Sequence, residues 1–285
     1  MSNFTRKNPT DYTSLHGRVL QSPAKPQAVI AIVHGFGEHI GRYEPMATLL
    51  SAEGFAVIGL DLHGHGHTPG ARGYVRRYER LREDVDMLVM EARERFPDLP
   101  LFLWGHSMGG GLVLDYVFDR GAIGSEGTRL VGAIATAPLI EAADPPPAPV
   151  FAAMKLLARI APKLAIKNTI TGDQISTLPE ERARYEADAL NHDRLSLALG
   201  LQILGAGKGL SKRREAFPVP LLLIHARGDT LTEFEASEAF AAAREGCNFH
   251  PLEGVAHEVH NDSSRDEVVR LITDFARETL KGETA

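Results

Sequence analysis

The residues best suited to chemistry surround Ser107, in the stretch Gly105-His106-Ser107-Met108-Gly109. Four mostly apolar residues, 101–104, precede this stretch as in a buried strand, and apolar residues recur at helical spacing after it. A chain that passes from strand to helix within one residue strains that residue, and the flanking glycines remove Cβ clashes. The pattern predicts a G-x-S-x-G nucleophile elbow with an outward-facing serine.

A serine nucleophile needs a general base, and the base needs an anion that fixes its tautomer. Asp229 follows a predicted strand at 221–225, and His257 follows the last predicted strand, at 249–252. These residues occur in the order serine, acid, histidine, which is one of the orders known for such triads. We therefore predict that Ser107, Asp229 and His257 are the catalytic residues.

Other residues compete for two of these roles. Asp173, Asp188 and Asp193 are rival acids, but they lie in an insertion away from the strand ends where ligands bind in an open parallel sheet. His260, three residues after His257, is the rival base, whereas His225 closes a strand and is interpreted as structural.

A second glycine-containing turn, His34-Gly35-Phe36-Gly37, follows the predicted strand at 28–33. Such a turn lets a backbone N–H point into a cleft, where it stabilises a developing oxyanion. A second donor comes from the residue after the nucleophile. We expect the N–H groups of Phe36 and Met108 to form the oxyanion hole.

Three alternating histidines, His63, His65 and His67, raise the possibility of a zinc site. The glycines between them leave the loop without a rigid element to aim three ligands at one ion. We favour a turn with hydrogen-bonded histidines, and we predict neither a metal nor an organic cofactor.

Composition argues against several classes of protein, among them nucleic-acid-binding, disulfide-bonded and membrane-spanning proteins. The 285 residues carry a formal net charge of −6, which argues against a nucleic-acid-binding surface. The single cysteine, Cys247, excludes an intramolecular disulfide. A polar N-terminus without an apolar signal-peptide segment, and no apolar run near the ~18 residues of a membrane span, favour a cytoplasmic location. Oligomeric state stays open.

Strand and helix patterns alternate along most of the chain. Strands are expected at 28–33, 55–60, 101–104, 130–135, 221–225 and 249–252, and helices at 42–51, 76–96, 108–119, 233–244 and 266–280. This alternation predicts an α/β fold with a parallel sheet covered by helices on both faces. Residues 12–20 are expected to form a short edge hairpin after a polar start.

The alternation stops at the proline-rich stretch 144–149 and resumes after the prolines at 217–220. We expect residues 138–216 to form a purely helical cap inserted between two parts of the core, 1–137 and 217–285. Lys155, Arg159 and Lys163 recur every four residues beside an apolar face. This segment suits transient contact with a membrane surface or an ordinary cap helix packed on the body, and both interpretations stay open.

Several motifs together resemble one family. They are His34-Gly35-Phe36-Gly37-Glu38-His39 with Gly41-Arg42-Tyr43, the stretch 64–70, and the elbow at 105–110. The chain is similar in these motifs, from about residue 12 to 278, to the monoacylglycerol lipase and bacterial lysophospholipase group of α/β-hydrolases. Thr68 stands where the family commonly has serine, and Phe36 is larger than its counterpart in the mammalian lipase.

The resemblance implies an α/β-hydrolase fold with a lipid-facing cap over an acyl tunnel. It also implies the triad of Ser107, Asp229 and His257 and an oxyanion hole from Phe36 and Met108. The expected function is a serine hydrolase that cleaves single-chain acyl esters, foremost monoacylglycerol, through an acyl-enzyme. The alternatives are a lysophospholipase, a general short-chain carboxylesterase, and a small-molecule receptor built on the same fold.

Overall fold

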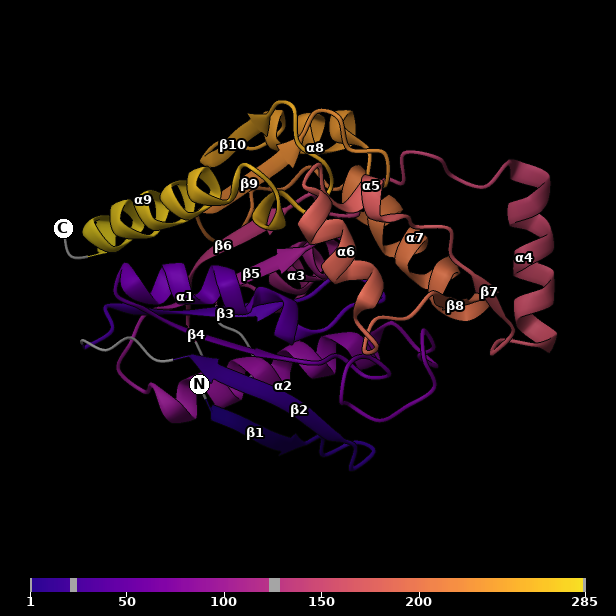
Figure 1. The fold of residues 1–285 in the computed structure, drawn as a ribbon, viewed down its shortest axis with the longest axis horizontal. Helices are drawn as coiled ribbons and strands as arrows, with labels where there is room; N and C mark the ends of the chain where they lie inside the picture. The colour runs from indigo at the N-terminus through magenta and orange to yellow at the C-terminus, as the bar shows by residue number, and fades with distance from the viewer. Residues whose placement is uncertain (1, 21–24, 123–128, 284–285) are drawn as a thin grey trace.

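The computed structural model describes residues 2–20, 25–122 and 129–283. Its centre is an eight-stranded sheet in which the order is β1-β2-β4-β3-β5-β6-β9-β10 (Figure 1). Strand β2 runs antiparallel to both of its neighbours, and all the other pairs are parallel. The strands are β1 (Ser2–Lys7), β2 (Ser14–Leu20), β3 (Ala28–Val33), β4 (Phe55–Leu60), β5 (Leu101–His106), β6 (Leu130–Thr136), β9 (Leu221–Ala226) and β10 (Cys247–Leu252).

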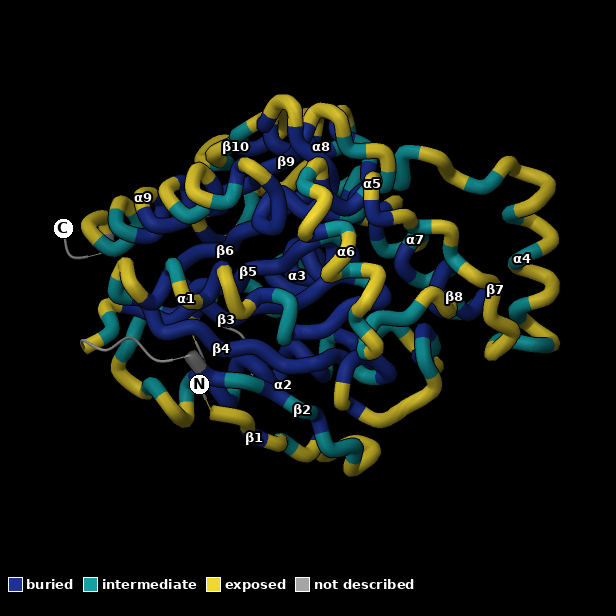
Figure 2. Tube along the Cα trace, in the orientation of Figure 1, coloured by how far each residue is buried: buried dark blue, intermediate teal, exposed yellow. Residues whose placement is uncertain are grey.

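Helices cover both faces of this sheet. Alternate residues of β3 point into two separate apolar clusters, as the two-residue period of a strand requires. One cluster contains α1 (Glu44–Ala52) and α9 (Arg265–Glu283), and the other contains α2 (Glu79–Arg95), α3 (Met108–Arg120) and α8 (Phe234–Ala242). The sheet is therefore buried on both sides (Figure 2), and the predicted α/β architecture is confirmed.

The N-terminal segment differs from the sequence-based expectation. The polar residues Ser2–Lys7 form strand β1, which pairs with β2 along its whole length, and β2 also pairs with β4. The hairpin therefore lies at the edge of the sheet, but its second strand belongs to the sheet interior. The residues of β1 are mostly polar because one face of an edge strand is exposed to water, so the apolar pattern does not predict this strand.

Six elements lie between β6 and β9. They are α4 (Ala148–Ile160), β7 (Ala165–Lys167), α5 (Gly172–Ile175), α6 (Pro179–Ala187), β8 (Arg194–Ser196) and α7 (Leu197–Lys212). They gather at one end of the sheet, with α4 farthest from it (Figure 1). The expectation of a purely helical segment is wrong, because β7 and β8 pair as a small antiparallel ribbon. Strands of three residues are too short to show a two-residue period in the sequence.

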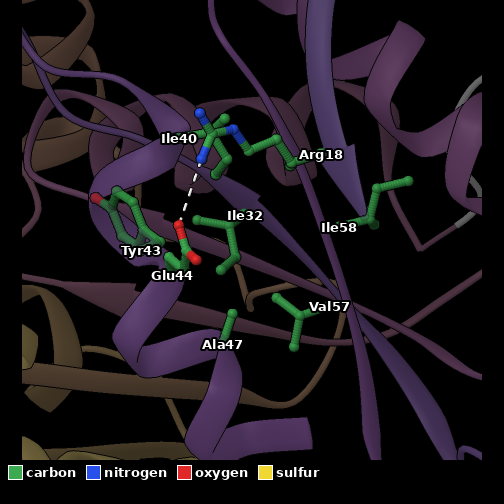
Figure 3. Close-up of a pocket in the computed structure, with 9 residues that line it drawn as sticks. Arg18, Ile32, Ile40, Tyr43, Glu44, Ala47, Val57 and Ile58 are labelled. Carbon is green, nitrogen blue, oxygen red and sulfur yellow. Dashed lines mark hydrogen bonds and ion pairs between the residues drawn. The ribbon is translucent and has the colours of Figure 1, made fainter. Parts of the chain in front are cut away.

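A small cavity lies beneath α1, between this helix and the sheet (Figure 3). Its volume of about 20 Å³ suits one water molecule rather than a substrate. Apolar side chains such as Ile32 and Val57 line it, and Arg18 and Glu44 approach each other to 3.5 Å beside it. This cavity is a packing void and takes no part in the site described below.

Candidate active site

Ser107 occupies the sharp turn between β5 and α3. Its backbone angles, φ 55° and ψ −121°, place a non-glycine residue in a strained region. A Cβ on Gly109 would lie 2.3 Å from the carbonyl oxygens of Val33 and His34, so only glycine lets α3 approach the end of β3 this closely. The local conformation is therefore the one that the elbow motif predicts.

Asp229 and His257 meet beside this turn. His257 Nδ1 lies 2.6 Å from Asp229 Oδ2, and both side chains are buried. The ring of His257 lies 4.7 Å, between centroids, from the ring of His106, the residue before Ser107. The loops after β9 and β10 thus join Asp229 and His257 at the carboxyl ends of parallel strands, and His257 packs against the residue that precedes Ser107.

The electrostatic surroundings of Asp229 and His257 determine which of the two residues carries the proton. Burial disfavours a charged His257, but the charge of Asp229 and the hydrogen bond between them outweigh it and raise the pKa of His257. Burial also opposes charge on Asp229, yet His257 and the hydrogen bonds from His225 and His257 hold the pKa of this carboxyl well below its usual range. Asp229 is therefore an anion that accepts the Nδ1 proton, which leaves His257 Nε2 free to act as a base.

Further groups hold the carboxylate of Asp229 in place. Its Oδ1 accepts the backbone N–H groups of Leu231 and Thr232, at 2.8 and 3.1 Å. Its Oδ2 accepts the Thr232 hydroxyl at 2.8 Å and His225 Nε2 at 3.1 Å. His225 Nδ1 in turn lies 2.8 Å from the hydroxyl of Ser237. His225 therefore orients the acid, a role that the sequence analysis missed; its spacing of four residues from Asp229 was the available signal.

The turn that carries Phe36 lies against the nucleophile. A Cβ added to Gly35 would stand 3.3 Å from the Cβ of Ser107. Met108 is the first residue of α3, and the N–H groups of a first helical turn have no acceptor within the helix. Both predicted oxyanion donors thus belong to backbone segments that adjoin Ser107.

A buried charge cluster lies behind this turn. Glu38 Oε1 accepts the N–H of Gly35 at 2.6 Å and the hydroxyl of Tyr43 at 2.9 Å. Arg42 donates to Glu38 Oε2 at 3.1 Å and to Glu258 Oε2 at 2.5 Å. The cluster joins the Phe36 turn to the residue after His257. In the sequence, Glu38, Arg42 and Tyr43 stand out only as part of the motif that resembles the family, and nothing there marks Glu258.

Glu38 and Glu258 share the guanidinium of Arg42, and their pKa values shift in opposite directions. Burial and then the charge of Glu258 raise the pKa of Glu38 to about 7. Burial also disfavours a charged Glu258, but Arg42, His260 and Asn261 outweigh it and lower its pKa. One excess negative charge therefore forms here as the pH rises through neutrality.

The segment between β6 and β9 contacts the loops that carry the candidate residues. The N–H of His192 donates to the carbonyl of Gly37 at 2.8 Å. The N–H of His257 donates to the carbonyl of Gln174 at 3.1 Å, and the Gln174 side chain donates to the Thr230 hydroxyl at 3.1 Å. The insertion is therefore bonded to the Phe36, Asp229 and His257 loops.

The rival acids lie elsewhere. Asp188 pairs with His39 at 2.8 Å and Asp193 with Lys167 at 3.3 Å, whereas Asp173 is exposed.

The rival base, His260, stacks on Tyr43 with 4.7 Å between ring centroids. Burial lowers the pKa of His260 to about 3. The contacts of Asp188, Asp193 and His260 are thus with residues other than Asp229 and His257.

The three alternating histidines point to different neighbours. His63 Nδ1 lies 3.5 Å from an Arg80 nitrogen, and His65 Nδ1 lies 3.1 Å from the carbonyl oxygen of His63. The His67 ring packs edge-on against that of His16. Within residues 2–20, 25–122 and 129–283, no group of three or more His, Cys, Asp or Glu side chains is arranged to hold a metal ion.

The sequence matches the family Hydrolase_4, described as serine aminopeptidase S33, over residues 24–264. The chain belongs to this family. It is 31% identical over 257 residues to a monoacylglycerol lipase of Mycolicibacterium smegmatis, covering 88% of each chain. It is also 29% identical to phospholipase YtpA of Bacillus subtilis, covering 88% of this chain and 95% of that protein.

One solved structure and one further relative agree with this membership. The crystal structure of a monoacylglycerol lipase from Paleococcus ferrophilus matches with a TM-score of 0.81 and 29% identity, covering 93% of this chain and 99% of that one. The chain also spans 28% of the length of an uncharacterized abhydrolase domain-containing protein of Dictyostelium discoideum, with 30% identity over 95% of this chain. This Hydrolase_4 member is thus a carboxylic ester hydrolase of the monoacylglycerol lipase group, with the α/β-hydrolase fold.

Proposed function

We propose that the protein hydrolyses single-chain acyl esters, foremost monoacylglycerols, through an acyl-enzyme on Ser107. The observation that carries this proposal is the buried Asp229–His257 pair, which lies next to the strained turn of Ser107. The relatives named monoacylglycerol lipase support glycerol as the head group.

In the first half-reaction, the Ser107 hydroxyl oxygen attacks the ester carbonyl while His257 Nε2 takes the hydroxyl proton. The N–H groups of Phe36 and Met108 hold the oxyanion. The bond between the acyl carbon and the glycerol oxygen then breaks, and His257 returns the proton to the leaving glycerol. Asp229 stabilises the imidazolium throughout.

In the second half-reaction, water attacks the acyl-enzyme with His257 as base. The bond to Ser107 breaks, its hydroxyl is restored and the fatty acid leaves. Residues of the chain carry every proposed step. Residues 138–216 act as a cap over the acyl chain, since this segment is bonded to the loops around Ser107.

The test is fatty-acid release from monoacylglycerols, lysophospholipids and p-nitrophenyl esters by the native chain and by Ser107→Ala. We expect serine-dependent release from monoacylglycerols and a fall in kcat on the order of 10⁶-fold in the variant. Full activity in Ser107→Ala would overturn the mechanism.

The same panel separates the alternatives. Preference for a phosphocholine head group would favour a lysophospholipase, as the likeness to phospholipase YtpA suggests. Preference for short p-nitrophenyl esters would favour a general esterase. Saturable binding without turnover would favour a receptor.

The cap also has a surface suited to a lipid bilayer. Helix α4 has no buried residue, and Leu156 and Ile160 are 60% and 80% exposed. Among the described residues, none of the helices combines the length and apolar character needed to cross a bilayer. Contact through α4 would therefore be peripheral, with Lys155, Arg159 and Lys163 attracted to anionic lipids.

A further inference from the structure

A cavity of about 370 Å³ lies between α7 and the connection from β6 to α4. This volume falls in the range of small-molecule pockets. The walls are largely apolar, and none of the five residues predicted to take part in catalysis lines them. The apolar lining residues are Leu139, Ile140, Ala142, Pro145, Pro146, Phe151 and Leu204.

One face of α7 makes this cavity polar at one end. Leu204, Lys208, Ser211 and Lys212 all line it, and their spacing of four, three and one residues places them on one side of the helix. The lining thus changes from apolar to cationic over about two turns. In the part of the chain that the structure describes, neither lysine forms an ion pair with a carboxylate, although Glu141 lines the same cavity.

A neighbouring cavity of about 280 Å³ extends the cationic end. It shares Glu141 and Ser211 with the first cavity and adds Arg214 and Arg244. Arg244 is 5% exposed, and two of its nitrogens donate to backbone carbonyls at 2.5 and 3.0 Å. Its Nε has no partner among the described residues. The guanidinium also lies over the rings of Phe240 and Phe118, 3.6 and 5.4 Å from their centroids, and it adds positive charge to this end of the lining.

The chemistry of this lining selects a ligand with one apolar chain and one anionic end. A neutral acyl chain would fill the apolar part but would leave the ammonium groups of Lys208 and Lys212 without an anion. The apolar wall begins at Leu139, whose N–H donates to the carbonyl of Ser107 at 2.9 Å. The cavity therefore starts at a residue bonded to the elbow.

We propose that this cavity binds a free long-chain fatty acid, with its carboxylate on Lys208 and Lys212 and its chain along Leu139, Phe151 and Leu204. The choice of a fatty acid rests on the proposed function, because the proposed reaction releases one.

The experiment measures binding of cis-parinaric acid, a fluorescent fatty acid, to the full chain carrying Ser107→Ala, below the micelle concentration. We expect Lys208→Gln with Lys212→Gln to raise the Kd at least about tenfold, since a charge-assisted hydrogen bond contributes about 1.5–3 kcal/mol. Lys208→Arg with Lys212→Arg keeps the charge and is expected to retain binding. Lys7→Gln with Lys25→Gln, outside both cavities, is the charge-matched control.

The alcohol with the same chain supplies a second comparison. We expect it to bind more weakly than the acid and to be insensitive to the lysine substitutions. Equal Kd values for acid and alcohol, or an unchanged Kd in the double glutamine variant, would overturn the proposal. Binding in this experiment needs no turnover, so its failure is distinct from a failure of the proposed hydrolysis.

Discussion

The strain at Ser107 and the ionisation of Asp229 are properties of single residues that suit both to the proposed hydrolysis. Ser107 is half-buried in a turn with φ 55°, and the buried carboxylate of Asp229 fixes the proton of His257 on Nδ1. His225 and Thr232 bind the same carboxylate oxygen, so the acid has one available orientation.

Asp229→Asn tests the electrostatic part of this arrangement. The charge of Asp229 raises the pKa of His257, so its removal leaves burial as the dominant effect and lowers that pKa. We expect kcat to fall about 10⁴-fold and the acidic limb of the kcat/KM profile to move to lower pH. Asp173→Asn, an exposed acid of the insertion, is the matched control. An acidic limb that stays in place would contradict the assignment of Asp229.

At the scale of elements, the cluster of Glu38, Arg42 and Glu258 joins the turn after β3 to the loop after β10. Burying two carboxylates with one guanidinium makes the cluster sensitive to pH. A carboxyl whose folded pKa lies above its unfolded pKa binds more protons in the folded chain.

Glu38→Gln is expected to change how stability depends on pH. The folded pKa of Glu38, about 7, exceeds the ordinary glutamate pKa of 4.5, so its contribution to stability is complete below about pH 4.5 and is lost as the pH rises through 7. Urea unfolding at pH 5 and pH 8 should show that the native chain loses more stability than the variant over this interval. Parallel pH dependence in the two chains would contradict the raised pKa.

The molecule as a whole presents α4 away from the body, on the side where the insertion lies (Figure 1). Its large apolar residues are exposed beside Lys155 and Arg159. Lys163 follows the end of the helix, contrary to the expected single helical face, and its Nζ lies 5.5 Å from the centroid of the Tyr74 ring. An amphipathic surface of this kind binds anionic membranes through apolar burial and charge together.

Substituting Lys155, Arg159 and Lys163 by glutamine should weaken binding to phosphatidylcholine vesicles containing phosphatidylglycerol. Each cation contributes about 1 kcal/mol near such a surface, so we expect about a hundredfold loss, measured by vesicle sedimentation. Lys7, Lys25 and Lys281 substituted together give the same change in net charge. Equal sedimentation of the native and substituted chains would exclude membrane contact through these residues.

The local sequence determined the sheet and the main candidate residues of this protein. The buried strands 28–33 and 55–60 agree with the structure because continuous apolar runs have one stable location, inside a covered sheet. The elbow is local in part: a Cβ on Gly105 would lie 2.2 Å from the Gly109 carbonyl oxygen, whereas Gly109 is required by its contact with the end of β3.

Only the tertiary structure showed what holds these residues together. His225 binding to Asp229, Glu38 beside Gly35, and Gln174 on the His257 loop are contacts between segments that local periodicity cannot relate. The same holds for strand β1 and the ribbon of β7 and β8, whose residues become strands because a partner strand accepts and donates their hydrogen bonds. Such partners are determined by the packing of the whole chain.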